Sequence, residues 1–386
     1  MVPRIAEKLL RKYSRQFRAV AVVGPRQSGK TTLVRQTFPN KPYVSLENPD
    51  ERILAEQDPR AFLSRFKSGA ILDEAQRVPS LFSYLQQVLD EAGKDGLFIL
   101  TGSNNFLLQQ SITQSLAGRI GYIDLLPLCY LEIMEFGKKK LSTDLILLNG
   151  CYPEVYDKKR EPGAWYPAYI RTYVERDVKQ IRNIENTLLF NRFLQLCAGR
   201  IGQMLSVNAL SNEVGADVRT INAWLSILQS SYLIHLLPPH HKNFNKRAVK
   251  SPKLYFVDTG LACSLLGIRS ENELFNSHFR GALFENHVIM EFLKMKNNSG
   301  SQTKLYFWRD NKGAEVDLIL DNGKRLIPVE IKSSQTFRDE HLRGLRTWMG
   351  WSKSKNGLLV YDGKQEFITK QNINIINWKS VGAIGI

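Results

Sequence analysis

The sequence predicts an α/β fold whose first part is built around a parallel β-sheet. Three short apolar runs, at residues 19–23, 70–72 and 97–100, have the length of buried strands. Parallel strands that are buried on both faces show this continuous apolar pattern instead of alternation. Each run is followed by glycine, acidic or polar residues, and helix-compatible sequence lies between the runs. The chain has 386 residues, too many for one hydrophobic core, so we expect roughly two to four domains.

The loop after the first run has the glycine, lysine and threonine spacing of a phosphate-binding loop. Backbone N–H groups of such a loop, with the positive end of the helix that follows, form an anion site. Lys30 is expected at the β- and γ-phosphates, and Thr31 at Mg²⁺. We therefore predict that the chain binds a nucleoside triphosphate, although the loop does not distinguish ATP from GTP. The predicted contacts are Gly24, Pro25, Arg26, Gln27, Ser28, Gly29, Lys30, Thr31 and Thr32.

Acidic and polar residues follow the second and third apolar runs. We predict that Asp73 holds Mg²⁺ through its water shell and that Glu74 polarises the attacking water. Ser103 and Asn104 follow a strand beside the loop, where ligands bind in open α/β sheets. These two side chains either sense the γ-phosphate or belong to an ordinary Gly-Ser-Asn turn, and both interpretations stay open.

Several short motifs of the chain occur together in one protein family. They are the loop 24–31, Leu-Asp-Glu-Ala-Gln at 72–76, Leu-Thr-Gly-Ser at 100–103, Leu-Ala-Gly-Arg at 116–119, Pro-Leu at 127–128, Gly-Cys-Tyr-Pro at 150–153 and Tyr-Val-Glu-Arg-Asp at 173–177. Over nearly its whole length the chain resembles the prokaryotic AAA-type ATPases with a C-terminal domain of unknown function (DUF4143). The resemblance implies a homo-oligomeric ATPase, with a hexamer as one candidate, and ATP and Mg²⁺ as cofactors. It also implies that Arg119 is an arginine finger acting on a neighbouring subunit; the alternative is a surface arginine.

The amino-acid composition indicates which kinds of molecule the chain binds. The chain has 53 Lys and Arg against 37 Asp and Glu, a formal net charge of +16, which favours nucleic acid first and an anionic membrane second. No apolar run approaches the ~20 residues of a membrane span, and the N-terminus lacks the apolar core of a signal peptide. The four cysteines are widely spaced and include no C-x-x-C pair. We therefore expect a cytoplasmic protein with DNA, and no membrane, as its partner.

Two helical modules are predicted in the middle of the chain. Residues 131–178 mix helical periodicity with turn signals, and an AAA-type chain carries a small helical lid at this position. Residues 203–237 have the pattern of a helix-turn-helix, with a turn at 214–217. Asp217 is a good N-cap for the second helix, 218–228. Strands are expected at 233–237 and 254–257, with a wing at 238–247 between them.

The predicted winged helix offers few groups for reading DNA. Positions 218, 221, 225 and 228 form an inward apolar stripe, which leaves Arg219 and Asn222 outward as base-reading types. Five basic residues and no acid occur from 242 to 253, and we predict phosphate contacts for Lys242, Lys246 and Arg247. The alternative is that the module packs between domains or contacts a protein.

The last third of the chain contains acidic residues and a lysine in segments that are expected to be a helix and two strands. Glu285 lies in the helix-compatible run 282–288, and the runs 314–320 and 327–332 are expected to be strands that carry Asp317, Glu330 and Lys332. This set resembles the PD-(D/E)XK nuclease superfamily, in the branch similar to Holliday-junction resolvases. By that resemblance Asp317, Glu330 and Glu285 hold Mg²⁺ and Lys332 orients the attacking water. The alternative is a domain that binds DNA without cutting it.

The predicted organisation is an AAA-type ATPase core at 1–130, a helical lid at 131–178, a winged-helix module at 179–253 and a nuclease-like α/β domain at 254–386. We expect an oligomeric Mg²⁺-dependent ATPase that couples ATP turnover to action on DNA, including branched DNA. One alternative is a nucleotide-dependent signalling or defence switch that acts on a protein partner. Another is a metal-dependent nuclease that its ATPase regulates.

Overall fold

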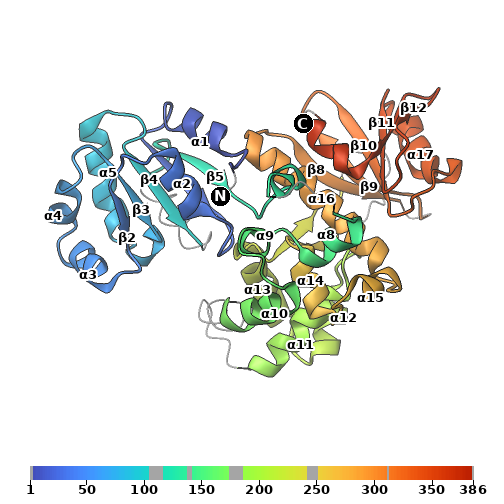
Figure 1. Ribbon diagram of the computed structural model, residues 1–386, viewed down its shortest axis with the longest axis horizontal. Coiled ribbons are helices and arrows are strands. Elements are labelled where there is room, and N and C mark those ends of the chain that lie inside the picture. The colour runs from blue at the N-terminus through green and yellow to red at the C-terminus, as the bar shows by residue number, and fades with distance from the viewer. Residues whose placement is uncertain are drawn as a thin grey trace. The chain divides into compact units, whose positions relative to one another are not determined.

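The computed structural model describes residues 3–103, 116–136, 141–173, 186–240, 251–310 and 313–384 (Figure 1). The chain folds into two compact units. The first unit comprises residues 1–128 with 230–232 and 297–300, and the second comprises the rest. In the described ranges, no helix is both long enough and apolar enough to cross a membrane.

A five-stranded parallel sheet forms the centre of the first unit, in the order β2-β3-β4-β1-β5. This arrangement confirms the predicted α/β class, and the three apolar runs become β1, β3 and β4. The strands are β1 (Ala19–Val23), β2 (Tyr43–Ser45), β3 (Ala70–Asp73), β4 (Phe98–Gly102) and β5 (Ile120–Asp124). The helices are α1 (Glu7–Tyr13), α2 (Lys30–Thr37), α3 (Pro49–Gln57), α4 (Pro59–Ser64), η1 (Ala75–Arg77) and α5 (Leu81–Ala92).

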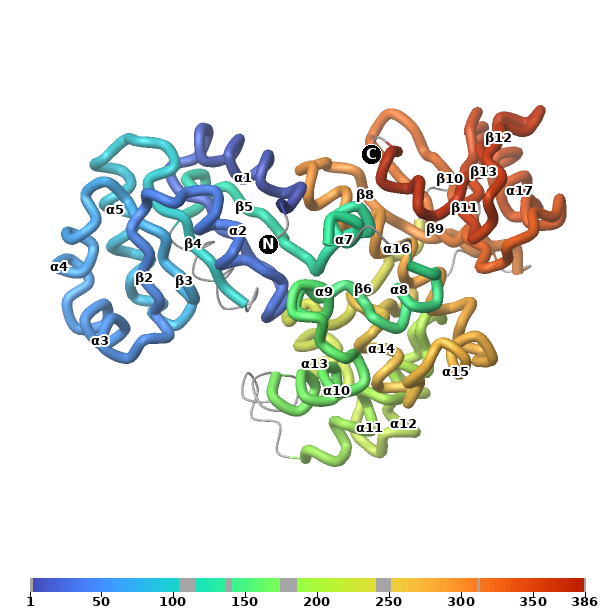
Figure 2. Tube along the Cα trace, in the orientation of Figure 1, coloured from blue at the N-terminus to red at the C-terminus, as the bar shows by residue number. Residues whose placement is uncertain are grey.

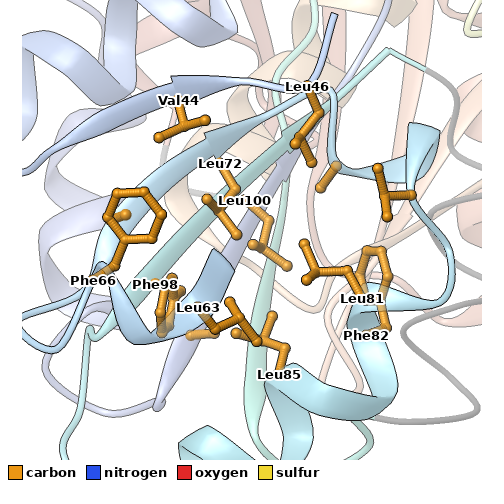
Figure 3. Close-up of a cluster of buried hydrophobic side chains, with 14 of the residues drawn as sticks. Val44, Leu46, Leu63, Phe66, Leu72, Leu81, Phe82, Leu85, Phe98 and Leu100 are labelled. Carbon is orange, nitrogen blue, oxygen red and sulfur yellow. The ribbon is translucent and has the colours of Figure 1, made fainter. Parts of the chain in front are cut away.

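Successive residues of the central strands face opposite sides of this sheet, and each side is covered. In β1, Ala19, Ala21 and Val23 belong to one apolar cluster, whereas Val20 and Val22 belong to another. The first cluster includes side chains of α4 and α5, several of which are labelled in Figure 3. The second includes side chains of α1 and α2. Burial on both sides explains why β1 is apolar at every position.

The second unit begins with short helices and a helix-turn-helix. Helices α8 and α10 pack against α14, so this part of the segment predicted as a lid belongs to the second unit. The lid itself stays a prediction. The helices are α7 (Tyr130–Met134), α8 (Thr143–Asn149), α9 (Pro153–Asp157), α10 (Pro162–Tyr169), α11 (Thr187–Ala198), α12 (Val207–Val214), α13 (Val218–Ser230), α14 (Thr259–Leu265), α15 (Glu271–Phe275), α16 (Arg280–Ser299), η3 (Asp339–Leu342), α17 (Arg343–Ser352) and η4 (Trp378–Ala383).

Two sheets complete the second unit (Figure 2). Strands β6 (Ile234–Leu237) and β7 (Lys253–Phe256) form an antiparallel ribbon. A six-stranded mixed sheet has the order β12-β13-β11-β10-β9-β8, in which β8, β9 and β10 are antiparallel and β10, β11 and β13 are parallel. Its strands are β8 (Lys304–Arg309), β9 (Glu315–Asp321), β10 (Leu326–Lys332), β11 (Gly357–Tyr361), β12 (Phe367–Ile368) and β13 (Ile373–Asn377).

The helix-turn-helix differs from its predicted pattern at one position. Asp217 accepts a hydrogen bond from the Thr220 amide at 2.9 Å, as an N-cap does, and Ile221, Leu225 and Leu228 are buried. Val218, which was expected to face inward, is 42 % exposed. It is the first residue of α13 and precedes the part of the helix that packs, so the inward stripe begins one turn later.

Candidate functional site

The loop 24–29 has a backbone that only glycine permits at its two ends. Gly29 has φ 91° directly before α2, and Gly24 has φ 153°. A Cβ atom added at Gly24 would lie 2.1 Å from the carbonyl oxygen of Leu125. The loop therefore follows β1 closely and turns into the N-terminus of α2, which is the geometry of an anion site.

The Lys30 side chain is buried inside this loop. Its ammonium donates to the carbonyl oxygens of Gly24 at 3.1 Å and Pro25 at 2.8 Å. Burial lowers the pKa of Lys30 to about 8, although the nearby Glu74 and Asp73 carboxylates act in the opposite direction. A buried ammonium with this low pKa would be stabilised by an anion such as a phosphate.

The Asp73 carboxylate, at the end of β3, collects three hydroxyl donors. Thr31 Oγ1 lies 3.1 Å from both carboxylate oxygens, Tyr43 donates to Oδ2 at 2.7 Å, and Thr101 donates to Oδ1. The predicted Thr31 and Asp73 pair is therefore together at the head of α2. A hydroxyl beside a carboxylate fits Mg²⁺, which prefers oxygen ligands and keeps several waters.

Glu74 follows in a left-handed backbone conformation, with φ 54°. Its Oε2 atom accepts hydrogen bonds from the Gln76 amide and, at 3.0 Å, from the Ser103 hydroxyl. Positive φ is uncommon for a residue other than glycine and is often found at functional sites. The structure thus brings Glu74 and Ser103 together, whereas Asn104 lies outside the described residues.

Two further arginines contact or belong to the phosphate loop. The buried guanidinium of Arg4 donates to the carbonyl oxygen of Ser28 at 2.7 Å and to that of Leu126 at 2.8 Å, and so ties the loop to the segment after β5. Arg26, by contrast, is directed toward the exposed Glu47, with 3.1 Å between the nitrogen and the carboxylate oxygen.

Arg119 lies at the amino ends of the parallel strands, whereas the phosphate loop of its own chain lies at their carboxyl ends. It precedes β5, whose first residue Ile120 is paired with Ala19, whereas the loop follows the carboxyl end of β1. Six strand residues separate the two levels, which is about 20 Å. Arg119 forms two hydrogen bonds with Asp90, at 2.7 and 2.9 Å. This position rules out action on its own nucleotide site.

A second charged site lies in the second unit, on neighbouring strands β9 and β10. Asp317 Oδ2 accepts the Ile331 amide at 2.8 Å and lies 3.9 Å from the Lys332 ammonium. Lys332 also donates to Glu330 Oε1 at 2.6 Å. The other oxygen of Glu330, Oε2, is buried and has no hydrogen-bond partner. Two of the predicted metal ligands, Asp317 and Glu330, are therefore adjacent to each other and to the predicted water-orienting Lys332.

Glu285 on α16 belongs to the same cluster, but its neighbours are a tyrosine and a lysine that the sequence did not indicate. Tyr255 donates to Glu285 Oε1 at 2.5 Å, and the ammonium of Lys253 lies 3.2 Å from the same atom. Lys253 also pairs with Glu315. Lys253 ends the basic stretch 242–253 and lies outside the predicted wing at 238–247. Its side chain is only 4 % exposed and is enclosed by acids, so this lysine is not part of an exposed basic surface.

The proximity of these carboxylates alters their protonation. Burial, and after it the Asp317 carboxylate, raise the pKa of Glu330 to about 8, with Lys332 acting in the opposite direction. Burial also raises the pKa of Glu285. For Lys253, burial favours a lower pKa, but Glu285, Asp317 and Glu315 outweigh it and raise the pKa. The cluster therefore has more negative charge than its lysines neutralise.

The residues predicted to contact nucleic acid are only partly described. Arg219 and Asn222 are exposed on α13, and the Asn222 amide donates to the Val218 carbonyl oxygen at 3.0 Å. Lys242, Lys246 and Arg247 lie outside the described residues. The contacts of these five residues with DNA stay predictions.

Among the described residues, one group of His, Cys and acid has metal-ligand spacing: Cys151, His287 and Glu291, with their ligand atoms within 4.8 Å of one another. The ammonium of Lys294 lies 3.0 Å from Glu291 Oε1, and the amide of Tyr130 donates to Oε2 at 2.8 Å. Because both oxygens of the buried Glu291 carboxylate already have donors, one of them a cation, we interpret this group as an ion-pair network rather than a metal site.

The residues with direct contacts to the two sites that were not assigned those roles from the sequence include Tyr43, Gln76, Lys253 and Tyr255. Gln76 lies two residues after Glu74, so proximity in the chain was a usable signal. The other three are on strands far away in the sequence, and only the folded sheets bring them to the acids that they contact.

A parallel sheet, a glycine-bounded loop at a helix N-terminus and an Asp-Glu pair at the end of β3 define a P-loop ATPase. Residues 16–134 match the AAA domain family, residues 142–272 match a domain of unknown function (DUF8612), and residues 280–381 match the domain of unknown function DUF4143. The chain therefore belongs to the family of AAA-type P-loop ATPases with a C-terminal DUF4143 domain, as its motifs indicated.

Relatives cover most of the chain. An uncharacterized protein of Mycobacterium tuberculosis is 30% identical over 369 residues, which cover 94% of this chain and 81% of the relative. An uncharacterized protein of Methanocaldococcus jannaschii is 25% identical, covering 83% and 76%. Among solved structures, the Walker-type ATPase of Pyrococcus abyssi is similar at 15% identity and a TM-score of 0.45, covering 67% of this chain and 94% of that one. AMPPCP-bound DnaA of Aquifex aeolicus is similar at 12% identity and a TM-score of 0.31, covering 58% and 86%.

Proposed function

We propose that the chain is an oligomeric, Mg²⁺-dependent ATPase that acts on DNA. The observation that carries the ATPase proposal is the Thr31 hydroxyl on the Asp73 carboxylate at the head of α2, with Glu74 as the next residue. Bound Mg²⁺ would neutralise charge on the β- and γ-phosphates. Lys30 binds and orients the same phosphates, and Glu74 accepts hydrogen bonds from Ser103 and Gln76, so its carboxylate is held in one orientation.

The assembly proposal depends on Arg119. Because this side chain is about 20 Å along the strands from its own phosphate loop, it can act only on the nucleotide of another subunit. The DNA proposal depends on the net charge of +16 and on the exposed Arg219 and Asn222. Duplex or branched DNA bound through phosphate contacts, with low sequence specificity, is the class of partner that fits these features.

The rate of ATP hydrolysis tests the partner. It is measured without DNA and then with single strands, duplexes and four-way junctions of equal nucleotide concentration, over a salt series. We expect DNA to raise the rate, and the stimulation to weaken steeply as salt increases, because counterions compete for the phosphates. The proposal would be contradicted if the rate of ATP hydrolysis did not change with DNA and the affinity for DNA did not change with salt or with DNA structure. Such results would favour the alternative of a nucleotide-dependent switch on a protein partner.

A second candidate activity, metal-dependent DNA cleavage, is favoured by Glu330 Oε2, a buried carboxylate oxygen without a donor. Asp317 and Glu330 fit a divalent cation, because hard cations prefer carboxylate oxygens and the pair lacks full compensation. Lys332, bonded to Glu330, is placed to orient a water. We expect Lys332→Ala to abolish Mg²⁺-dependent cleavage of a labelled junction and to leave ATP hydrolysis unchanged. Absence of cleavage by the unaltered chain would end this candidate.

A further inference from the structure

The acidic cluster of the second unit contains a lysine from outside the strands that carry its acids. Lys253 is the first residue of β7, and its ammonium pairs with Glu285 at 3.2 Å and with Glu315. It also lies 5.6 Å from the centre of the Phe307 ring, a cation–π distance. The cluster has four carboxylates, of Glu285, Glu315, Asp317 and Glu330, and the first two are therefore held by a buried internal cation.

The other two carboxylates are less completely compensated. Lys332, at the end of β10, is about one-third exposed and donates to Glu330 Oε1, while Glu330 Oε2 is buried without a partner. Asp317 receives the Ile331 amide and lies 3.9 Å from Lys332. A buried carboxylate oxygen without a donor is costly, and a bound cation removes that cost.

We infer that Lys253 takes the place of a second metal ion, so that this cluster binds a single divalent cation, at Asp317 and Glu330. The inference rests on the proposed metal-dependent cleavage. Glu285 and Glu315 stay with Lys253, which is a positioning residue because it fixes these two acids without contacting the ion.

The charge of the cluster supports one ion over two. The carboxylates of Glu285, Glu315, Asp317 and Glu330 face the cations Lys253, Lys332 and Arg309, which is 3.3 Å from Glu315. With all four carboxylates ionised, one negative charge is left uncompensated. A single divalent ion reverses it to one positive charge, whereas a second ion would concentrate positive charge at a largely buried place.

The number of bound Mn²⁺ ions per chain tests the inference, with free Mn²⁺ quantified by electron paramagnetic resonance. The full-length chain is used at pH 8 without nucleotide, in an Asp73→Asn background that removes the metal position of the nucleotide site. We expect one ion with Lys253 present and two in Lys253→Met, because that change frees Glu285 and Glu315. The first ion should also bind roughly tenfold more tightly in Lys253→Met, since a nearby positive charge is lost.

Two variants serve as controls. Lys253→Arg keeps the charge and should bind one ion, and Lys364→Met removes an exposed lysine of the same unit and should also bind one. Two ions with Lys253 present, or one ion in a folded Lys253→Met chain, would overturn the inference and leave the metal proposal intact. No ion with Lys253 present would overturn the proposed cleavage itself. If Lys253→Met does not fold, the count in the chain that retains Lys253 still decides between one ion and two.

Discussion

Two inactive variants, Lys30→Ala and Arg119→Ala, are expected to restore ATP hydrolysis to each other when they are mixed. Lys30→Ala removes the phosphate contact but retains Arg119. Arg119→Ala removes the proposed finger but retains an intact phosphate loop. Arginine fingers contribute about 10³-fold or more to kcat, so Arg119→Ala alone should lose at least that factor. The loss corresponds to about 4 kcal/mol of transition-state stabilisation.

The magnitude of the recovery follows from the position of Arg119 in the fold. Since Arg119 precedes β5 and the phosphate loop follows β1, each active interface needs a loop from one subunit and an arginine from its neighbour. In a 1:1 mixture that assembles at random, about a quarter of the interfaces combine both intact parts, whatever the number of subunits. The mixture should therefore reach about a quarter of the unaltered activity per subunit.

The assay is steady-state phosphate release at a fixed total protein concentration, after the two variants have been allowed to exchange subunits. Arg18→Ala is the matched control, because Arg18 also pairs with Asp90 but is not the proposed finger. It should leave kcat within about twofold of the unaltered chain. A mixture no more active than the sum of its parts, or an Arg119→Ala variant with full activity, would refute the reasoning.

Three further predictions concern single side chains. Tyr43→Phe removes the hydroxyl that donates to Asp73 and should raise the Mg²⁺ concentration for half-maximal ATP binding about tenfold or more. Tyr84→Phe, which alters a half-buried ring on α5, should leave that concentration unchanged. Glu74→Gln should bind ATP normally yet hydrolyse it about 10²-fold more slowly or worse; a normal rate would place the water-directing role elsewhere. The raised pKa of Glu330 means that the folded chain binds its proton more tightly than the unfolded chain, so this group's stabilisation is lost as pH rises from about 4.5 to 8. Without divalent ions, the unfolding free energy of Glu330→Gln should fall less between pH 4.5 and 8 than that of the unaltered chain, by up to about 1.4 kcal/mol per pH unit. Denaturant titrations at several pH values measure it, and equal dependence on pH in the two chains would contradict the raised pKa of Glu330.

The nucleotide site was largely predictable because its parts are contiguous or come at strand ends. Residues 24–31 are contiguous and comprise the loop 24–29 and the first two residues of α2. Strand β1 is buried on both faces, which requires an apolar residue at every position. Asp73 and Glu74 end another such strand, and parallel strands bring their carboxyl ends to one edge of the sheet. The missing part was Tyr43, because its hydroxyl reaches Asp73 only through the pairing of β2 with β3.

The sequence named Asp317, Glu330, Glu285 and Lys332 as candidates for the second site, but it did not indicate Lys253 or Glu315. Glu330 and Lys332 alternate on one strand, so periodicity alone placed these two residues on one face. Asp317 joins them through the antiparallel pairing of β9 with β10. Lys253 ends a basic stretch beside the predicted wing, and local composition gave no sign that its side chain is buried. Its burial depends on the pairing of β7 with β6 and on Glu285 and Glu315 from two other elements. No local pattern carries that information.

Lys30 and Lys253 are both buried, yet burial lowers the pKa of Lys30 whereas carboxylates raise that of Lys253. The difference indicates that Lys30 lacks a close anionic partner among the described residues. Lys253 has carboxylate partners, whereas Lys30 has carbonyl oxygens and a pKa of about 8. Phosphates would raise the pKa of Lys30, so MgATP binding should take up about half a proton at pH 8 and much less at pH 7, where Lys30 is already protonated. Affinity should accordingly fall as pH rises through 8. Calorimetry in buffers of different ionisation enthalpy measures the uptake, with the pH 7 titration as the control. A binding enthalpy at pH 8 that is the same in every buffer would show that Lys30 is fully protonated before the nucleotide arrives.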